Sequence, residues 1–354
     1  MVTRFSSIST KRVSKALSSV TFDRCMVAMC DYGDFHIATK RHIIKNVLGP
    51  NAQKRHQVHR DTLVDNIVKD LHMHVKTNGL QPVNFRNFYS SELFGLAMKE
   101  ALGRDVEYID VEELGRLERS EIYRILMMDP IEIALEYVDW RDFFPYLKWI
   151  PKRTSERKKI EKMEFRRLAV MKALMNEQMI VAFGEEMDCY LKYLLTEGKS
   201  LTDKEIASLL WEVLIESSDT TMVTTEWALF ELAKNQKLQI AINLYGCNMD
   251  ENQWEKPQQW NPERFLNNEK YTPNDLYKTM AFGAGKRLCP GPLQVASIVR
   301  TTIGRLVQEF EWSLENGEEE NVEIVGIVNE KLHPMHAVLR PRKSLPRSAG
   351  KFVG

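Results

Sequence analysis

The sequence predicts a mainly α-helical fold with small β regions, built as a single domain over residues 1–354. Up to about residue 235, glycine is sparse and long amphipathic stretches follow one another, as is typical of packed helices. From residue 240 onward, short apolar runs alternate with turns, and the late segment VEIVGIVNEKLHPMHAVLRPR alternates enough for one or two short strands. We therefore expect a helical part, 1–235, and a more irregular part, 240–354, of the same domain.

Helical spacing of apolar residues is clearest in six segments of the first part. The predicted helices lie near residues 34–48, 55–76, 90–102, 118–137, 157–180 and 203–235. In the second part, a helix is predicted to follow Gly291, because apolar residues recur there at the helical interval. These residues are Val295, Val299, Ile303, Leu306 and Phe310.

An aromatic cluster closed by prolines, DWRDFFPYLKWIP, occupies residues 139–151. One interpretation is a packed loop. The other is a hydrophobic surface that touches membrane lipid, which the basic segment 152–167 beside it favours. The sequence leaves both interpretations open.

Composition is that of a soluble globular protein. The chain carries 49 basic and 49 acidic side chains, and 44% of its residues are hydrophobic. No apolar stretch is long enough to span a membrane, and no nucleic-acid partner is predicted. The start, MVTRFSSISTKRVSKALSSV, lacks the apolar core of a signal peptide and is interpreted as the interior of a truncated domain. The five cysteines show no paired pattern, which indicates a reducing, cytosol-facing environment.

Two pairs of histidines lie close enough in the sequence to be considered as metal ligands. His56 and His59 lie three apart on a predicted helix, but no cysteine or carboxylate set completes a site there. His72 and His74, two apart, would point away from each other on a helix. Both pairs are interpreted as surface side chains.

The segment FGAGKRLCPG, residues 282–291, carries the most specific motif. It fits F-x-x-G-x-R-x-C-x-G, the haem-thiolate signature, at Phe282, Gly285, Arg287, Cys289 and Gly291. A cysteine thiolate bound to haem iron favours O–O cleavage, which indicates an oxygenase. Arg287 offers a cationic fork suited to a haem propionate. The helix predicted after Gly291 directs its positive dipole end at Cys289 and helps to hold the sulfur ionised.

The alternative role for Cys289 is that of a small buried apolar residue. Five matched positions within ten residues, followed by the required helix, disfavour it. At these residues the chain resembles the cytochrome P-450 superfamily. The resemblance implies the P-450 fold and a haem b cofactor whose iron is bound axially by Cys289.

A second constellation, ESSDTT at residues 216–221, lies inside a long helical segment. Its small hydroxyl residues weaken a helix interior because they compete for backbone carbonyls, so a bent helix is expected. A helix N-cap is the alternative, but apolar helix precedes the motif as well as following it. The family resemblance implies that Asp219 and Thr220 are the acid–alcohol pair of an oxygen-activating helix, 203–235. Ser217 stands where the family usually has glycine or alanine.

A third match lies early in the chain, where YGDFH at residues 32–36 leads into Lys40 and Arg41. The segment resembles the family element whose tryptophan and arginine contact a haem propionate. His36 replaces the usual tryptophan. The resemblance implies that Lys40 or Arg41 pairs with a propionate.

Several longer stretches resemble the plant ent-kaurene oxidase family. They include KRHIIKNVLGPNAQKRHQVHRDTL, EYVDWRDFFPYLKWIP and ESSDTTMVTTEWALFELAKN. The resemblance implies successive oxidation of a diterpene methyl group to a carboxylic acid, in gibberellin or related diterpenoid biosynthesis. It also implies electrons from NADPH through a cytochrome P-450 reductase, and a membrane surface of the endoplasmic reticulum or chloroplast envelope, facing the cytosol.

Two parts of the family pattern are absent, so an incomplete P-450 fold is predicted. The amino-terminal part does not occur, and the chain passes from FELAKNQKLQ directly to IAINLYGCNMD. Relatives carry the E-x-x-R helix between these segments, so Arg264 lacks the partners of its usual Glu-Arg-Arg network. A catalytically inactive family member, with at most a haem-binding or interaction role, is therefore the alternative to an active monooxygenase. A haem-binding sensor is disfavoured by the retained Asp219 and Thr220.

Overall fold

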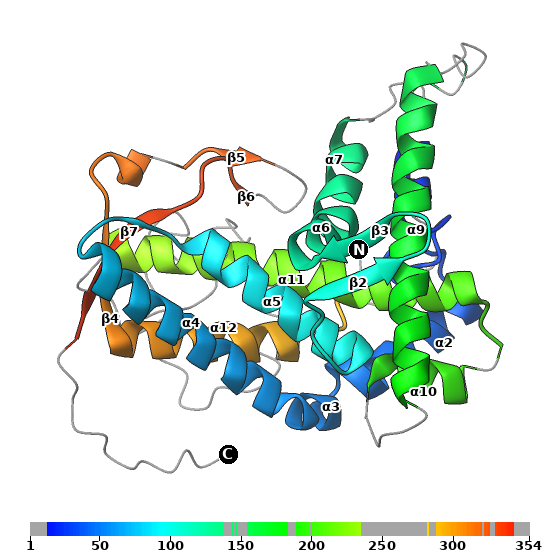
Figure 1. Ribbon diagram of the computed structural model, residues 1–354, viewed down its shortest axis with the longest axis horizontal. Helices are drawn as coiled ribbons and strands as arrows, with labels where there is room; N and C mark the ends of the chain where they lie inside the picture. The colour runs from blue at the N-terminus through cyan, green and yellow to red at the C-terminus, as the bar shows by residue number, and fades with distance from the viewer. Residues whose placement is uncertain are drawn as a thin grey trace, which may run out of the picture.

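The computed structural model describes residues 13–136, 144, 146, 154–182, 189–198, 200–234, 282, 288–320, 322–325 and 330–342. Within these residues the chain is mainly helical with small sheets, which confirms the predicted fold class. The longest helix, α11 (Asp203–Lys234), runs through the middle of the molecule and the other elements surround it (Figure 1).

The helices that precede and follow α11 vary widely in length. They are α1 (Lys15–Val20), α2 (Asp34–Ile43), α3 (Pro50–Arg55), α4 (Gln57–Asn78), α5 (Phe85–Leu102), α6 (Arg119–Tyr123), α7 (Asp129–Glu136), α9 (Thr154–Ala182), α10 (Tyr190–Glu197) and α12 (Pro292–Glu309). Two π-helical turns, Ile44–Leu48 after α2 and Arg124–Met128 after α6, continue those helices, and a 3-10 turn covers Glu318–Glu320.

The strands form three small antiparallel sheets. In the first, β7 (His336–Pro341) lies between β1 (Val83–Asn84) and β4 (Phe310–Leu314), with Trp312 opposite Leu339. In the second, β2 (Tyr108–Val111) pairs with β3 (Gly115–Glu118) as a hairpin, and in the third β5 (Ile324–Val325) pairs with β6 (Glu330–Lys331). The first sheet lies at one end of α11 (Figure 1). Helix α5 begins directly after β1, and α12 ends directly before β4, so both helices adjoin this sheet.

Two clusters of buried apolar side chains flank the middle of α11. The first cluster takes in the first half of α11 up to Leu214, together with residues of α5, α9 and α10. The second begins on α11 at Met222 and takes in α4, the start of α5, α12 and the β4–β7 sheet. The polar segment of α11 that contains Asp219 therefore lies where the two cores meet.

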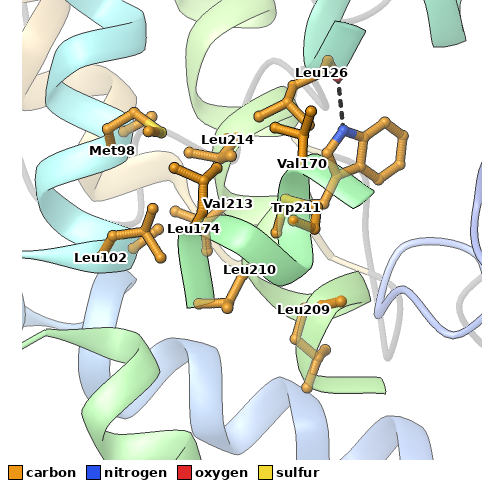
Figure 2. Packing of buried hydrophobic residues seen from close by; sticks show 14 of the residues in the cluster. Met98, Leu102, Leu126, Val170, Leu174, Leu209, Leu210, Trp211, Val213 and Leu214 are labelled. Atoms are coloured by element: carbon orange, nitrogen blue, oxygen red, sulfur yellow. Dashed lines mark hydrogen bonds between the residues drawn. The ribbon is translucent and has the colours of Figure 1, made fainter. Parts of the chain in front are cut away.

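Residues 206–214 of α11 are buried on all sides, including the polar Ser208 and Glu212. Glu212 is satisfied by the backbone N–H groups of Val27 and Ala28, at 2.8 and 2.7 Å. Figure 2 shows Trp211 among leucines of α11, Leu126, and Val170 and Leu174 of α9. Its indole Nε1 donates to the carbonyl of Leu126 at 2.7 Å. That bond satisfies the one polar group of a large buried aromatic residue.

The sequence located the long helices and the short strands of the segment 322–342, and it missed other short elements. All six predicted helical segments and the helix after Gly291 are present, with 34–48 matched by α2 and its π-helical turn. Helices α1, α3 and α10 and the β2–β3 hairpin were not predicted, because segments of four to eight residues carry too little periodicity. Phe310 was assigned to the helix but opens β4, and its side chain remains buried.

One histidine prediction was wrong. His56 is buried rather than on the surface, with Nε2 at 3.4 Å from the carbonyl oxygen of Asn46 and its ring stacked on that of His59. Burial lowers the pKa of His56 to about 4, so the ring is neutral. In the part of the chain that the structure describes, no cluster of histidine, cysteine and carboxylate side chains is arranged to hold a metal ion.

The structure describes only some of the residues that could contact a membrane. No helix among the described residues is both long and apolar enough to cross a bilayer. Most of the aromatic cluster 139–151 lies outside the described residues. Phe144 and Tyr146, which are described, are exposed and form an edge-to-face pair with ring centroids 5.9 Å apart. Both interpretations of the cluster remain open.

Candidate functional site

Cys289 lies in a short turn that leads directly into α12. Its backbone N–H donates to the carbonyl of Phe282 at 2.9 Å, which joins the first residue of the motif to the cysteine. The N–H of Gly291 donates to Cys289 Sγ at 3.4 Å, and α12 begins at the next residue. A Cβ at Gly291 would make only ordinary contacts, at 3.6 Å from Leu48 and 3.9 Å from Sγ. Among the described residues, Gly291 therefore serves the site through its amide.

Lys40 of α2 is bound to the same turn. Its Nζ donates to the carbonyl of Leu288 at 2.8 Å, immediately before Cys289. Arg41, the next residue of α2, is exposed. Two other predicted haem-binding residues, Gly285 and Arg287, lie outside the described residues, as does Arg264. The structure thus brings together Phe282, Cys289, Gly291 and Lys40.

The Cys289 thiol is exposed, yet nearby protein shapes its ionisation. Partial burial raises the pKa of Cys289, the Gly291 amide and Lys40 lower it, and the carboxylate of Glu216 raises it. The influence of Glu216 on this pKa is consistent with a position of this part of α11 near the Cys289 turn. Glu216 opens the ESSDTT motif, and the sequence alone predicted no role for it. It lies one helical turn before Thr220.

Thr220 lies on the same side of α11 as Glu216. Both side chains are exposed, and residues four apart on a helix share a face. The Thr220 hydroxyl donates to the Glu216 carbonyl at 2.9 Å, and the Thr224 hydroxyl donates to the Thr220 carbonyl at 2.8 Å. A hydroxyl held in this way keeps its oxygen available to a molecule bound between α11 and the Cys289 turn.

The hydroxyls of this segment compete for helix carbonyls, as predicted. Ser217, Ser218 and Thr225 donate to the carbonyls of Val213, Leu214 and Thr221, respectively. The helix is nonetheless uninterrupted from Asp203 to Lys234. The extra bonds are therefore made without a break in α11.

Asp219 faces a different side of α11, toward α5 and β6. Its side chain is half-buried, and burial is the main reason that its pKa rises to about 6. The carboxylate of Glu330 raises this pKa further, while the guanidinium of Arg86 lowers it. An acid with such a pKa holds and releases a proton close to neutral pH, as general acid–base chemistry requires.

Arg86 joins the three elements around Asp219. Its guanidinium contacts Glu226 of α11 at 2.7 Å and Glu330 of β6 at 2.7 Å, and it donates to the carbonyl of Lys331 at 3.0 Å. Glu226 also accepts from the backbone N–H of Met335 at 2.9 Å. We call Arg86, Glu226 and Glu330 the Arg86 cluster. Sequence reasoning missed it because its members lie far apart in the chain and match no motif.

The match to known proteins decides the family. The model of the family described as "Cytochrome P450" matches residues 9–243 and 237–337, which together make up most of the chain. This chain belongs to the cytochrome P450 family. It is therefore a member of a family of haem-thiolate monooxygenases, which confirms the resemblance found at Cys289 and at residues 216–221.

The relatives of this P450 include plant diterpene oxidases. It is 44% identical to an ent-kaurene oxidase of Salvia miltiorrhiza over 410 residues, which covers 97% of this chain and 78% of the relative. It is 40% identical to ent-kaurene oxidase 2 of Oryza sativa subsp. japonica over 409 residues, 97% of this chain and 80% of the relative. Ent-sandaracopimaradiene 3-hydroxylase of the same rice is 36% identical over 411 residues, with 97% and 80% covered.

The match of this P450 to the family model is divided into two segments. The two segments matched by the family model meet and overlap at residues 237–243. The span aligned with the Salvia protein, 410 residues, is longer than the 354 residues of this chain. The overlap of the two matched segments falls where the sequence predicted a missing internal segment.

Proposed function

We propose that this P450 oxidises a methyl group of a hydrophobic diterpene in successive steps to a carboxylic acid. The observation that carries the proposal is 44% and 40% identity to two ent-kaurene oxidases over nearly the whole chain. The rice 3-hydroxylase is named for a different compound, ent-sandaracopimaradiene. The relatives therefore support diterpenes as the substrate class more strongly than they support ent-kaurene as the one substrate. The product would enter gibberellin or related diterpenoid biosynthesis.

The arrangement around Cys289 fits the haem that the family uses. Cys289 is exposed, its Sγ accepts the Gly291 N–H, and the residue stands directly before the first turn of α12. In the proposal Cys289 would bind the iron of haem b through its sulfur. The other residues assigned to haem binding are Phe282, Gly285, Arg287, Gly291, Lys40 and Arg41.

When bound, the haem would supply dioxygen activation with electrons that a reductase takes from NADPH. The protein's own contribution is to orient hydrogen bonds and move protons. Gly291 donates its N–H to the sulfur, which withdraws part of the thiolate charge. Thr220 presents its hydroxyl on the facing side of α11, and Asp219 holds an exchangeable proton on the adjacent position.

The partners follow from the same family. We propose NADPH–cytochrome P450 reductase as the electron donor, and a membrane surface of the endoplasmic reticulum or chloroplast envelope, facing the cytosol, as the location. A lipid surface is where a hydrophobic diterpene concentrates. No nucleic-acid partner is proposed.

A second candidate is a family member that has lost catalysis and retains at most haem binding. The observation that favours it is the junction at residues 237–243, beside an alignment longer than the chain. Loss of an internal segment would remove the support of the site, and misplacement by about an ångström is enough to cost catalysis.

The experiment compares the full chain with Cys289→Ser and Thr220→Ala. With haem added, the reduced carbon monoxide complex of the wild type and of Thr220→Ala should show a red-shifted Soret band, and that of Cys289→Ser should not. With a plant reductase and ent-kaurene, Thr220→Ala should release more peroxide per electron than the wild type. A red-shifted band in Cys289→Ser contradicts the ligand assignment. A normal band without any oxidised diterpene supports the second candidate.

A further inference from the structure

The first turn of α12 is held to the last turn of α5 by a buried hydrogen bond. Gln294 Nε2 donates to Glu100 Oε2 at 2.6 Å, and the two residues are 3% and 0% exposed. Gln294 lies three positions after Gly291, whose amide donates to Cys289 Sγ. A side chain in the first turn of a helix moves with that turn as a rigid unit. The bond therefore reaches the Cys289 turn through very few residues.

The Glu100 carboxyl is kept neutral where it lies. Complete burial raises its pKa to about 8, while Arg60 of α4 and the bond from Gln294 lower it by less. The guanidinium of Arg60 donates to the side-chain and backbone oxygens of Gln53, at 3.0 and 2.5 Å, and its attraction on Glu100 acts from a distance. Glu100 Oε1 has no hydrogen-bond partner among the described residues. A neutral acid that is fully desolvated accepts one short bond and has little freedom to exchange it for another.

We propose that Glu100 and Gln294 are positioning residues for the cysteine ligand, which fix the first turn of α12 and with it the turn that presents Cys289. The inference rests on the proposed function, since it assumes that Cys289 binds haem. It adds a role for two residues that neither the haem-loop motif nor the oxygen-helix motif includes. The alternative is that the bond only stabilises the α5–α12 packing, without effect on the sulfur.

The same two helices provide a matched control. Further along α12, Tyr89 of α5 donates its hydroxyl to Thr302 at 3.4 Å and accepts from Thr225 of α11 at 3.1 Å. This contact is also fully buried, and it also joins α5 to α12. It lies well beyond the first turn of α12. A purely structural role predicts that loss of either contact has the same consequences.

The test uses the full chain with haem and five variants: Glu100→Leu, Gln294→Leu, Glu100→Gln, Tyr89→Phe and Cys289→Ser. The readout is the fraction of the reduced carbon monoxide complex that shows the red-shifted, thiolate-type Soret band. We expect both Leu variants to lose at least half of this fraction. Glu100→Gln, which can still accept the bond, should retain it. Tyr89→Phe should unfold at a lower temperature while keeping the wild-type fraction.

Two outcomes overturn the inference: Leu variants that keep the wild-type fraction, or a Tyr89→Phe variant that loses as much as they do. If the Leu variants take up no haem, alkylation of Cys289 in the haem-free chain gives the second measurement. A several-fold change of its rate in both Leu variants, absent in Tyr89→Phe, supports the inference, and unchanged rates contradict it. A wild type without a thiolate-type band, or a Cys289→Ser variant with one, contradicts the proposed function instead, and the alkylation rates then decide the positioning role alone.

Discussion

The two ends of α5 are joined to the rest of the fold by polar contacts of opposite kinds. Near its start, Arg86 is charged and paired with Glu226 and Glu330. Near its end, Glu100 is neutral and bonded to an amide. The difference follows water access: the side chains of Arg86 and Glu330 are 16% and 28% exposed, whereas Glu100 is fully buried. At these two ends of α5, the ion pair occurs where water still reaches Arg86 and Glu330, whereas the fully buried Glu100 keeps its proton.

The largest expected effect comes from breaking the charged end. Arg86→Leu leaves Glu226, which is 0% exposed, without its guanidinium. An uncompensated buried charge costs about 3–5 kcal/mol, so the free energy of unfolding should fall by that amount in urea titrations at pH 7. The control is Arg104→Leu, because Arg104 pairs with Glu177 at 2.7 Å on the surface and should cost less than about 1 kcal/mol. Equal losses in the two variants would mean that burial does not distinguish the pairs.

An effect of opposite sign and at most comparable size is expected at the neutral end. The pKa of Glu100 is raised from 4.5 to about 8 by folding, so the unfolded chain releases this proton first and wild-type stability falls as pH rises between these values. Glu100→Gln has no such proton. Its stability relative to the wild type should therefore rise by up to about 1.4 kcal/mol per pH unit between pH 5 and 7, and level off above pH 8. Urea titrations of both proteins across this range measure it, and a pH-independent difference would show that Glu100 is charged when folded.

Asp219 is less buried than Glu100 and its pKa is raised less, so its substitution should have the smallest effect of the three. Folding raises its pKa from 3.8 to about 6, so the stabilising contribution of the protonated acid is present below pH 3.8 and is lost by pH 6. Asp219→Asn should gain about 1–2 kcal/mol relative to the wild type across that window, less than the full shift implies because the side chain is only partly desolvated. Thermal unfolding at pH 4 and pH 6.5 checks this. A gain that continues to pH 8 would place the pKa of Asp219 with that of Glu100.

The sequence predicted the long elements and the helix that follows Cys289, and it could not predict the contacts between distant residues. The turn before α12 was predictable because the fixed residues around Cys289 lie within one short segment. The pairing of Arg86 with Glu226 and Glu330 was not, since only the fold brings α5, α11 and β6 together. Lys40 shows both sides: the resemblance assigned it to a haem propionate, but only the structure gives its bond to the Leu288 carbonyl, beside Cys289.

The division of the interior into two clusters has a consequence for synthesis of the chain. Every member of the first cluster lies between Val20 and Leu214, so this core can close once α11 has begun to leave the ribosome. The second cluster needs residues as late as Leu339, and until they emerge, Phe85 and Tyr89 of α5 and Phe230 of α11 have no cover from α12 or the sheet. We expect the nascent chain to be partly folded at this stage, with the apolar surface of the second cluster exposed. A chaperone that binds exposed apolar surface would bind this state.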